Sequence, residues 1–412
     1  MGSNAERQPQ CARTHPLKIF DAAKSEGRYL YACAPMVRYS KLAFRQTVQH
    51  YGTDLCWTPM ILAKEFNRNQ FARDSDLTIS TTGSELPTIV QFGANSPLEL
   101  SRASSLAAPY VNGVDLNCGC PQSWACAETL GAALMERREL VRDMVATTRR
   151  RLEADGWATG READMNNTVG KGKSVSVKIR VHTDLRKTVD FITTVLGDEQ
   201  NRNIDWLTIH PRTRYTQSSV PINLEALALL TDMFGDKLPI LVSGDVFTLS
   251  TLPYTSHLLE PMPTFTSAAS TQSSPNSSST AHHSQTNGMP TGGSVRPHLP
   301  KLAGLMSARA LLANPALFAG HETCPWEAVD VFMNHVARAP LPLKLGIHHL
   351  TEMCSAGFGP DRSALLSKRE RIRLTEFDNW IDVIDYVDEV KAARGIEPIA
   401  RFANDTSIDR SN

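Results

Sequence analysis

The sequence predicts an α/β fold, a (β/α)8 TIM barrel followed by a small all-helical C-terminal domain. Short β-branched or aromatic runs alternate with amphipathic stretches, which is typical of βα units in a parallel sheet. Eight such runs occur, and polar or reactive side chains stand at their ends, where barrel enzymes place their chemistry. After residue 322 these runs stop and only amphipathic helical stretches remain.

Each expected strand is a short run of apolar, β-branched or aromatic residues. In chain order the strands are Tyr31–Met36, Leu55–Pro59, Thr88–Phe92, Gly113–Asn117, Val175–Arg180, Trp206–His210, Pro239–Ser243 and Leu302–Met306. The helices expected between them are Lys41–His50, Pro97–Ala108, Ala127–Leu152, Leu185–Leu196 and Leu224–Phe234. The second of these begins with proline after Ser96, a favoured first-turn position.

Two of the gaps between strands are long. Residues 156–173 are rich in Gly and Asn and predict a surface loop. Residues 261–300 contain nine Ser, six Thr and six Pro, and Arg296 is their only fully charged residue. Such a segment cannot bury enough apolar surface to offset its ordering entropy, so we expect a disordered insert. Without it, the stretch 31–320 has about 250 residues, the usual size of this barrel.

Four further helices are expected after the barrel, at Trp326–Arg338, Leu343–Met353, Ser367–Phe377 and Trp380–Ala392. The predicted organisation is therefore a polar N-terminal extension (1–27), a barrel (28–322), a helical domain (323–400) and a tail (401–412). Basic residues concentrate in Ser367–Arg373 and in Arg149–Arg151. Each cluster alone is typical of a solvated helix face; together they favour contacts with phosphate groups.

Composition excludes several classes of protein. The 43 basic and 43 acidic residues cancel, so no strong overall field indicates a nucleic-acid partner, although a local basic face would suffice. The eight cysteines show no regular spacing, which predicts reduced thiols in a cytoplasmic or nuclear, soluble protein, and no zinc pattern is present. We found no signal peptide and no apolar run long enough to span a bilayer.

The segment Gly113–Pro121 carries the clearest chemical signal. A buried strand ends at Asn117, and a tight turn then presents Cys120, a possible proton donor beside a hydrogen-bonding carboxamide. Other strand ends also carry functional groups, and Lys178 on a buried strand needs a partner or a ligand. In chain order the strand-end residues are Met36, Pro59, Gln91, Asn117 with Cys120, Lys178 with Arg180, His210 with Arg212, Gly244 with Asp245, and Arg309.

The last two strands are followed by small residues. Ser243-Gly-Asp245 and Ser307-Ala-Arg309 let backbone N–H groups approach an anion, and the loops after strands seven and eight are the common phosphate site of these barrels. A phosphorylated ligand is expected there, and flavin mononucleotide (FMN) would fit. A cation near the flavin ring, such as Lys178, would stabilise the anionic reduced form.

Taken together, these motifs resemble the tRNA-dihydrouridine synthases, flavoenzymes that reduce uridines in tRNA. The resemblance covers about residues 28–320 and rests on Ala34-Pro-Met36 with Phe44-Arg45, Val90-Gln-Phe-Gly93, Asp115-Leu-Asn-Cys-Gly-Cys-Pro121, Val177-Lys-Ile-Arg180, Thr208-Ile-His-Pro-Arg-Thr-Arg214, Ser243-Gly-Asp245 and Gly304-Leu-Met-Ser-Ala-Arg309. Two further segments, beginning at Trp57 and Leu312, are most similar to the eukaryotic branch that acts at D-loop positions 20a and 20b.

The resemblance implies FMN, NADPH or NADH as hydride donor, and tRNA as substrate, bound in part by the helical domain. It implies Cys120 as the proton donor, with Asn117 and Arg212 facing the uracil. The implied FMN ligands are Pro35, Met36, Gln91, Lys178, His210, Ser243, Gly244, Asp245, Ala308 and Arg309. The chain departs from the common family pattern at Ser243, Pro211 and Ala308; Pro211 removes a backbone N–H.

Two alternatives stay open from the sequence. One is an FMN-dependent barrel reductase of a small-molecule pyrimidine or enone, against which the basic helical tail argues. The other is a catalytically inactive RNA-binding relative, against which the presence of Cys120, Lys178 and His210 argues.

Overall fold

The computed structural model describes residues 15–80, 87–159, 172–198, 202–253 and 301–396 of the chain. The insert expected to be disordered, 261–300, and the expected tail, 401–412, lie outside the described residues.

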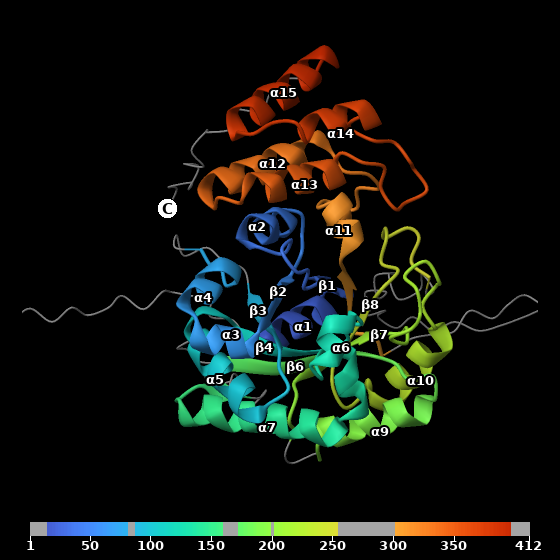
Figure 1. The fold of residues 1–412 in the computed structure, drawn as a ribbon. Coiled ribbons are helices and arrows are strands. Elements are labelled where there is room, and N and C mark those ends of the chain that lie inside the picture. The colour runs from blue at the N-terminus through green and yellow to red at the C-terminus, as the bar shows by residue number, and fades with distance from the viewer. Residues whose placement is uncertain (1–14, 81–86, 160–171, 199–201, 254–300, 397–412) are drawn as a thin grey trace, which may run out of the picture.

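Eight parallel strands close into a barrel, which confirms the predicted fold class (Figure 1). The barrel strands are β1 (Leu30–Cys33), β2 (Leu55–Leu62), β3 (Thr88–Gly93), β4 (Gly113–Cys118), β6 (Gly172–Arg180), β7 (Trp206–His210), β8 (Ile240–Ser243) and β9 (Gly304–Ser307). Pairing of β1 with β9 and of β4 with β6 completes the ring. The short strand β5 (Ala158–Thr159) pairs only with β6.

The strand β2 extends beyond its predicted end at Pro59. Its pairing with β3 shifts register between Trp57 and Met60 and then continues to Leu62. Proline has no N–H to donate, so it interrupts the ladder, and the irregularity lets the strand resume on its far side. Pro59 is therefore a bulge position within a longer strand.

Most helices around the barrel bury one face, whereas α4 (Gln70–Asp76) has no buried residue. In α9 (Leu185–Leu196), the buried side chains Thr188, Phe191, Ile192 and Val195 recur at helical spacing. The side chain of Asp184 caps the first turn of this helix. The other elements of the ring are α2 (Leu42–His50), α3 (Ala63–Arg68), α4 (Gln70–Asp76), α5 (Pro97–Ala107), α10 (Leu224–Phe234), α11 (Arg309–Ala313), and the 3-10 turns η1 (Ala108–Tyr110) and η4 (Leu317–Ala319).

The region expected to be one helix, Ala127–Leu152, is three elements instead. These are α6 (Ser123–Ala127), the 3-10 turn η2 (Gly131–Glu136) and α7 (Arg138–Ala154). Thr129 and Gly131 both have left-handed backbone angles, with φ of 58° each, and a right-handed helix cannot pass through them. The break places η2 directly behind the turn that carries Cys120.

A helix that the sequence did not predict, α1 (Pro16–Ser25), closes the N-terminal end of the barrel. Its Leu17 and Phe20 join a buried cluster with residues at the starts of several strands, including Trp206. The rings of Phe20 and Trp206 have centroids 5.5 Å apart. This apolar plug leaves the C-terminal ends of the strands as the open end of the barrel.

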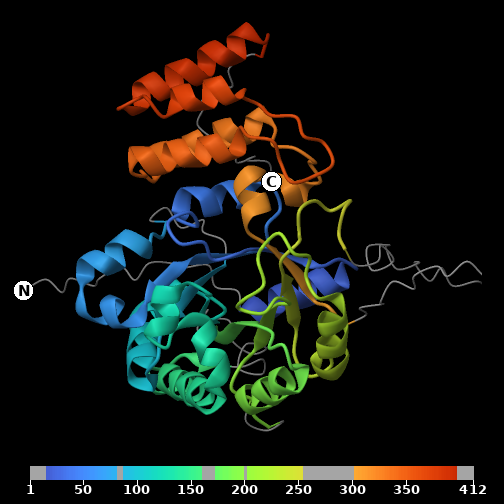
Figure 2. The same ribbon diagram turned by 45° about the vertical axis from the view of Figure 1, so that its right-hand side comes forward.

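The last four helices lie above α2 and α11, and we call these four helices the helical layer (Figures 1 and 2). It consists of α12 (Trp326–Arg338), α13 (Leu343–Met353), α14 (Lys368–Leu374) and α15 (Trp380–Ala393), with α14 and α15 stacked on α12 and α13. The ring of His349 in α13 lies between Phe44 of α2 and Phe332 of α12, with centroid distances of 5.1 and 4.9 Å. One hydrophobic core therefore continues from the barrel into the layer.

Candidate active site

The predicted site residues lie at the C-terminal end of the barrel because all its strands are parallel and their register is aligned. Asn117 at the end of β4 is opposite Lys178 of β6. Arg180 of β6 is opposite His210 at the end of β7. Ser243 at the end of β8 is opposite Met306 of β9, two residues before Ala308.

Asn117 builds the turn that presents Cys120. Its Oδ1 accepts hydrogen bonds from the backbone N–H groups of Gly119 at 3.0 Å and Cys120 at 2.9 Å. Its Nδ2 donates to Oε1 of Gln91 at 2.8 Å. Cys120 itself is half-buried. Asn117 thus positions the thiol, while its expected contact with uracil stays a prediction.

Other residues support the same turn from behind and from the side. Gly131 lies against Cys120, and a Cβ atom added there would be 2.5 Å from the Cys120 carbonyl oxygen. The backbone N–H of Ala132 donates to that oxygen at 2.8 Å. Arg180 donates to the carbonyl oxygens of Gly119 and Thr213, both at 2.8 Å, and so joins the loops after β4 and β7.

A buried polar chain runs from this turn into the barrel. Gln91, fully buried, donates from Nε2 to Oδ2 of Asp115 at 2.7 Å, and Ser176 donates to Oδ1 at 2.7 Å. Burial raises the pKa of Asp115 to about 6, although the bonds from Gln91 and Ser176 and the charge of Lys178 act in the opposite direction. Asp115 is the final acceptor in the series of hydrogen bonds that begins at the backbone N–H of Cys120.

Lys178 places a cation inside the barrel beside the turn. Burial lowers its pKa to about 8, and the neighbouring Arg180 adds to this effect, while Asp115 and Cys120 oppose it. Among the described residues, its ammonium group forms no salt bridge. A buried amine of this kind is suited to hydrogen-bond an electron-rich ligand.

His210 is held in one orientation by Arg212. Nη1 of Arg212 lies 3.0 Å from Nε2 of His210. Burial lowers the pKa of His210 far below its ordinary value, helped by Lys178 and Arg180, so the ring is neutral. Since guanidinium can only donate, Nε2 must accept and Nδ1 carries the proton.

Arg212 is itself buried, with 4% of its surface exposed. It also donates to Asp245 Oδ1 at 2.5 Å and to the Val220 carbonyl oxygen at 2.7 Å. The guanidinium is therefore directed into the protein and positions His210 and Asp245. The contact with uracil expected for Arg212 has no counterpart in this arrangement and stays a prediction.

The turn after β8 has the geometry expected of an anion-binding loop. Gly244 has φ of 114°, and a Cβ atom there would lie 2.8 Å from Cδ2 of His210, so glycine is required. Asp245 follows with φ of 55°, and its Oδ2 accepts the backbone N–H of Ile222 at 2.8 Å. Its carboxylate is thus satisfied by the protein, leaving the backbone of the turn to face a ligand.

The turns after β8 and β9 are joined, because Ser307 Oγ donates to the Val246 carbonyl oxygen at 2.9 Å. Arg309 begins α11, which has only five residues, and its side chain is exposed. On the other side, Met36 donates its backbone N–H to Ser40 Oγ at 3.0 Å and lies half-buried next to Pro35. Small residues, a glycine and the cation of Arg309 therefore gather at the ends of β8 and β9, an arrangement suited to an anionic ligand.

Comparison with known proteins identifies the family of the chain. Residues 32–258 match the family model described as dihydrouridine synthase. The chain belongs to the dihydrouridine synthase family. Two relatives are named tRNA-dihydrouridine(20a/20b) synthase, with NAD(P)+ given in the name, and a human relative has the same name with "-like" added. Identity is 33% for the Schizosaccharomyces pombe protein, over 91% of each chain. It is 35% for the human protein, over 77% of this chain and 79% of that one, and 33% for the Saccharomyces cerevisiae protein, over 91% and 84%.

The resemblance recognised in the sequence is therefore confirmed, including its 20a/20b branch. In this dihydrouridine synthase, the sequence did not single out Gly131 and Ser176, and it placed Asp115 in a family motif without a role. Each acts through a contact across strands or loops, and Gly131 alone left a local signal, a glycine inside an otherwise helical stretch.

Two features are absent from the described residues. No group of three or more His, Cys, Asp or Glu side chains there is placed to hold a metal ion. No helix in the same part of the chain has both the length and the apolar character needed to cross a membrane.

Proposed function

We propose that this synthase reduces the C5–C6 double bond of a D-loop uridine in tRNA, at position 20a or 20b, with NAD(P)H as reductant and FMN as cofactor. The observation that carries the proposal is the Cys120 thiol, held by Asn117 at the open end of a family-typical barrel, next to the buried Lys178. The names of its relatives supply the substrate and the position.

The proposed cofactor ligands are Pro35, Met36, Gln91, Lys178, His210, Ser243, Gly244, Asp245, Ala308 and Arg309. The fit rests on the glycine cradle at Gly244, on the exposed cation of Arg309, and on the Lys178 ammonium group, which forms no salt bridge within the described residues. When bound, FMN would accept a hydride from NAD(P)H and deliver one to C6 of the uracil.

The side chains of the protein then have separate tasks. Cys120 donates a proton to C5 of the uracil as the second half of the reduction. Lys178 provides a positive charge, and His210 a neutral Nδ1–H donor, for polar atoms of the ligand ring. The target base must leave its stack to reach the barrel, which costs a few kcal/mol.

We also propose that the helical layer contacts tRNA, although fewer basic residues are available than the sequence indicated. Arg371 donates to backbone carbonyl oxygens within the layer, and Arg373 pairs with Glu376 at 2.6 Å. Lys368 and Arg369 remain for phosphate contacts. In α7, Arg149 pairs with Asp205 at 2.9 Å, so that cluster contributes less still.

An anaerobic half-reaction tests the function. The purified protein is reduced with NADPH, tRNA lacking dihydrouridine is added, and flavin absorbance is followed. We expect rapid reoxidation by tRNA and none by free uridine. Reduction without reoxidation by tRNA would contradict the RNA substrate, and a protein that binds tRNA but no flavin would indicate an inactive relative.

The matched variant is Cys120→Ala, with Cys126→Ala as its control. Cys126 lies in α6, just after the Cys120 turn, and its thiol donates to the Cys120 carbonyl oxygen at 3.9 Å. Loss of a general acid typically lowers the rate about 10²–10⁴-fold. For Cys120→Ala we expect this loss in the rate of flavin reoxidation by tRNA. Reduction of the flavin by NADPH should be unchanged in both variants. A normal rate of reoxidation in Cys120→Ala would contradict the role of Cys120 as proton donor.

A further inference from the structure

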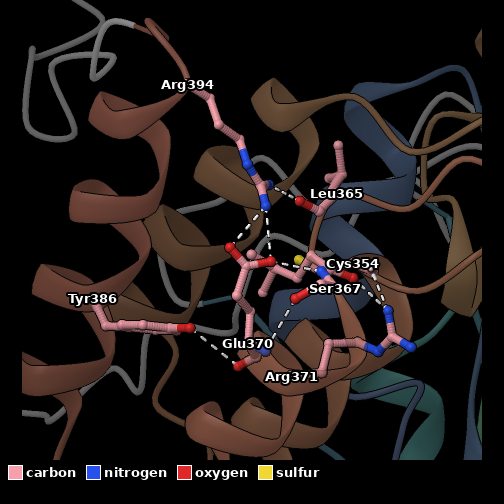
Figure 3. Close-up of polar contacts among 8 residues, drawn as sticks. Cys354, Leu365, Ser367, Glu370, Arg371, Tyr386 and Arg394 are labelled. Atoms are coloured by element: carbon pink, nitrogen blue, oxygen red, sulfur yellow. Dashed lines mark hydrogen bonds and ion pairs between the residues drawn. The ribbon is translucent and has the colours of Figure 1, made fainter.

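The loop between α13 and α14 projects from the helical layer and is closed at its base. The backbone N–H of Leu366 donates to the Cys354 carbonyl oxygen at 3.0 Å, which joins the two ends of the loop. Arg371 donates to the carbonyl oxygens of Cys354 and Leu366, and Arg394 donates to that of Leu365 (Figure 3). Two arginines of the layer therefore fix this loop, 354–366, at its base.

Glu370 secures Arg394 from within α14. Its carboxylate accepts two hydrogen bonds from Arg394 Nη2, both at 2.8 Å, and one from the backbone N–H of Ser367 at 2.6 Å (Figure 3). Ser367 in turn caps the helix through its hydroxyl. The loop is thus built on a connected ionic network rather than left free.

The tip of the loop, Gly357-Phe358-Gly359, lies against the barrel. Arg362 donates to the Gly357 carbonyl oxygen at 2.7 Å and so tightens the tip. A Cβ atom on Gly359 would be 2.8 Å from Cγ2 of Thr248, in the segment that follows the Ser243–Asp245 turn. Only glycine permits this close approach.

Phe358 contacts the residues of the candidate phosphate site directly. Its ring stacks on Phe247, with centroids 5.3 Å apart and planes 7° from parallel. The guanidinium carbon of Arg309 lies over the same ring, 5.8 Å from its centroid. Nη1 of Arg309 also reaches Ser218 Oγ at 3.5 Å. An exposed arginine is thereby restricted to one region between an aromatic ring and a hydroxyl.

We infer that Phe358 is a positioning residue for Arg309, so that the helical layer completes the site for the cofactor's phosphate. This inference rests on the proposed function. An exposed arginine loses side-chain entropy when it binds an anion. The ring reduces that loss by restricting the guanidinium in advance, and the N–H groups of Arg309 other than the one at Ser218 are left for a phosphate monoester.

The test is the affinity of the deflavinated full-length chain for two flavins that differ only in the phosphate, FMN and riboflavin, measured by quenching of flavin fluorescence. For Phe358→Ala we expect FMN binding about 3- to 30-fold weaker, the range of a cation–π contact, and riboflavin binding unchanged. Phe358→Tyr keeps the ring face and should restore FMN affinity.

Phe377→Ala is the matched control, because Phe377 lies beneath Arg373 in the same layer at 5.1 Å and should affect neither flavin. The effects of Phe358→Ala and Arg309→Met on FMN affinity should not add. If Phe358→Ala weakens the binding of FMN and riboflavin equally, the inference is wrong, because that pattern indicates a general loosening of the flavin site.

Unchanged FMN affinity with weaker tRNA binding would also overturn the inference and would assign Arg309 to an RNA phosphodiester. If the parent protein binds neither FMN nor riboflavin, the proposed function itself is wrong. This outcome comes from the parent protein alone and does not depend on any variant.

Discussion

Asp115 determines the direction of the hydrogen bonds that end at the Cys120 turn. In this series of hydrogen bonds, every donor is directed toward Asp115. The backbone N–H of Cys120 donates to Asn117, Asn117 donates to Gln91, and Gln91 donates to the Asp115 carboxylate. A carboxylate only accepts, so it fixes both amides in one orientation. The motif around the thiol therefore depends on a residue that does not touch it.

Asp115→Leu should disturb this order, because a side chain of similar size without an acceptor leaves Nε2 of Gln91 unpaired and no longer fixes the orientation of either amide. We expect tRNA-dependent reoxidation to slow by about 10- to 100-fold, the effect of misplacing a reacting group, with FMN retained. The rate of Cys120 alkylation should change in parallel. Ser176→Ala removes one donor to Asp115 without releasing either amide and should have a smaller effect; equal effects would contradict the ordering role.

At the scale of elements, α15 is joined to α12 by a buried ion pair. Lys391 Nζ lies 2.5 Å from Asp330 Oδ2, and their side chains are 1% and 2% exposed. Lys391→Met should lower the free energy of unfolding by about 3–5 kcal/mol, since the Asp330 charge stays buried without its ammonium partner. Urea denaturation measures this loss, and the double variant Lys391→Met/Asp330→Leu should recover most of it. A single variant as stable as the parent would contradict the prediction.

The elements that the sequence predicted well are those whose signal is local. All eight barrel strands were found near their expected positions, because β-branched runs such as that ending at Arg180 are buried on both faces. Helix α1 was not predicted, since Leu17 and Phe20 gain their burial only when the finished barrel meets them. Cys120 could be identified from its turn, whereas Gly131 is required by a contact that forms only after η2 folds back onto Cys120.

At the scale of the whole molecule, His349 lies where the barrel meets the helical layer. Its ring is fully buried among Tyr39, Phe44 and Phe332, and neither ring nitrogen has a well-formed hydrogen bond within the described residues. Burial lowers its pKa to about 3, and the neighbouring His348 adds to this effect, while the backbone of Tyr39 opposes it. Folding therefore requires the neutral ring.

The folded-state pKa of His349 is depressed below its ordinary value of about 6.5, so its contribution is complete above that pH and is lost as pH falls. At pH 5 the loss amounts to about 2 kcal/mol of unfolding free energy. His349→Phe should remove this dependence, so the variant should gain stability over the parent between pH 7 and 5 in thermal melts. His348→Asn, at a half-exposed neighbour, is the control. If His349→Phe and the parent lose stability in parallel as pH falls, the contact between the barrel and the helical layer does not sense pH.

If the two proteins diverge, lowering the pH from 7 to 5 should weaken FMN binding in the parent before global unfolding. The reason is that Phe358 reaches Arg309 only while the helical layer stays docked on the barrel.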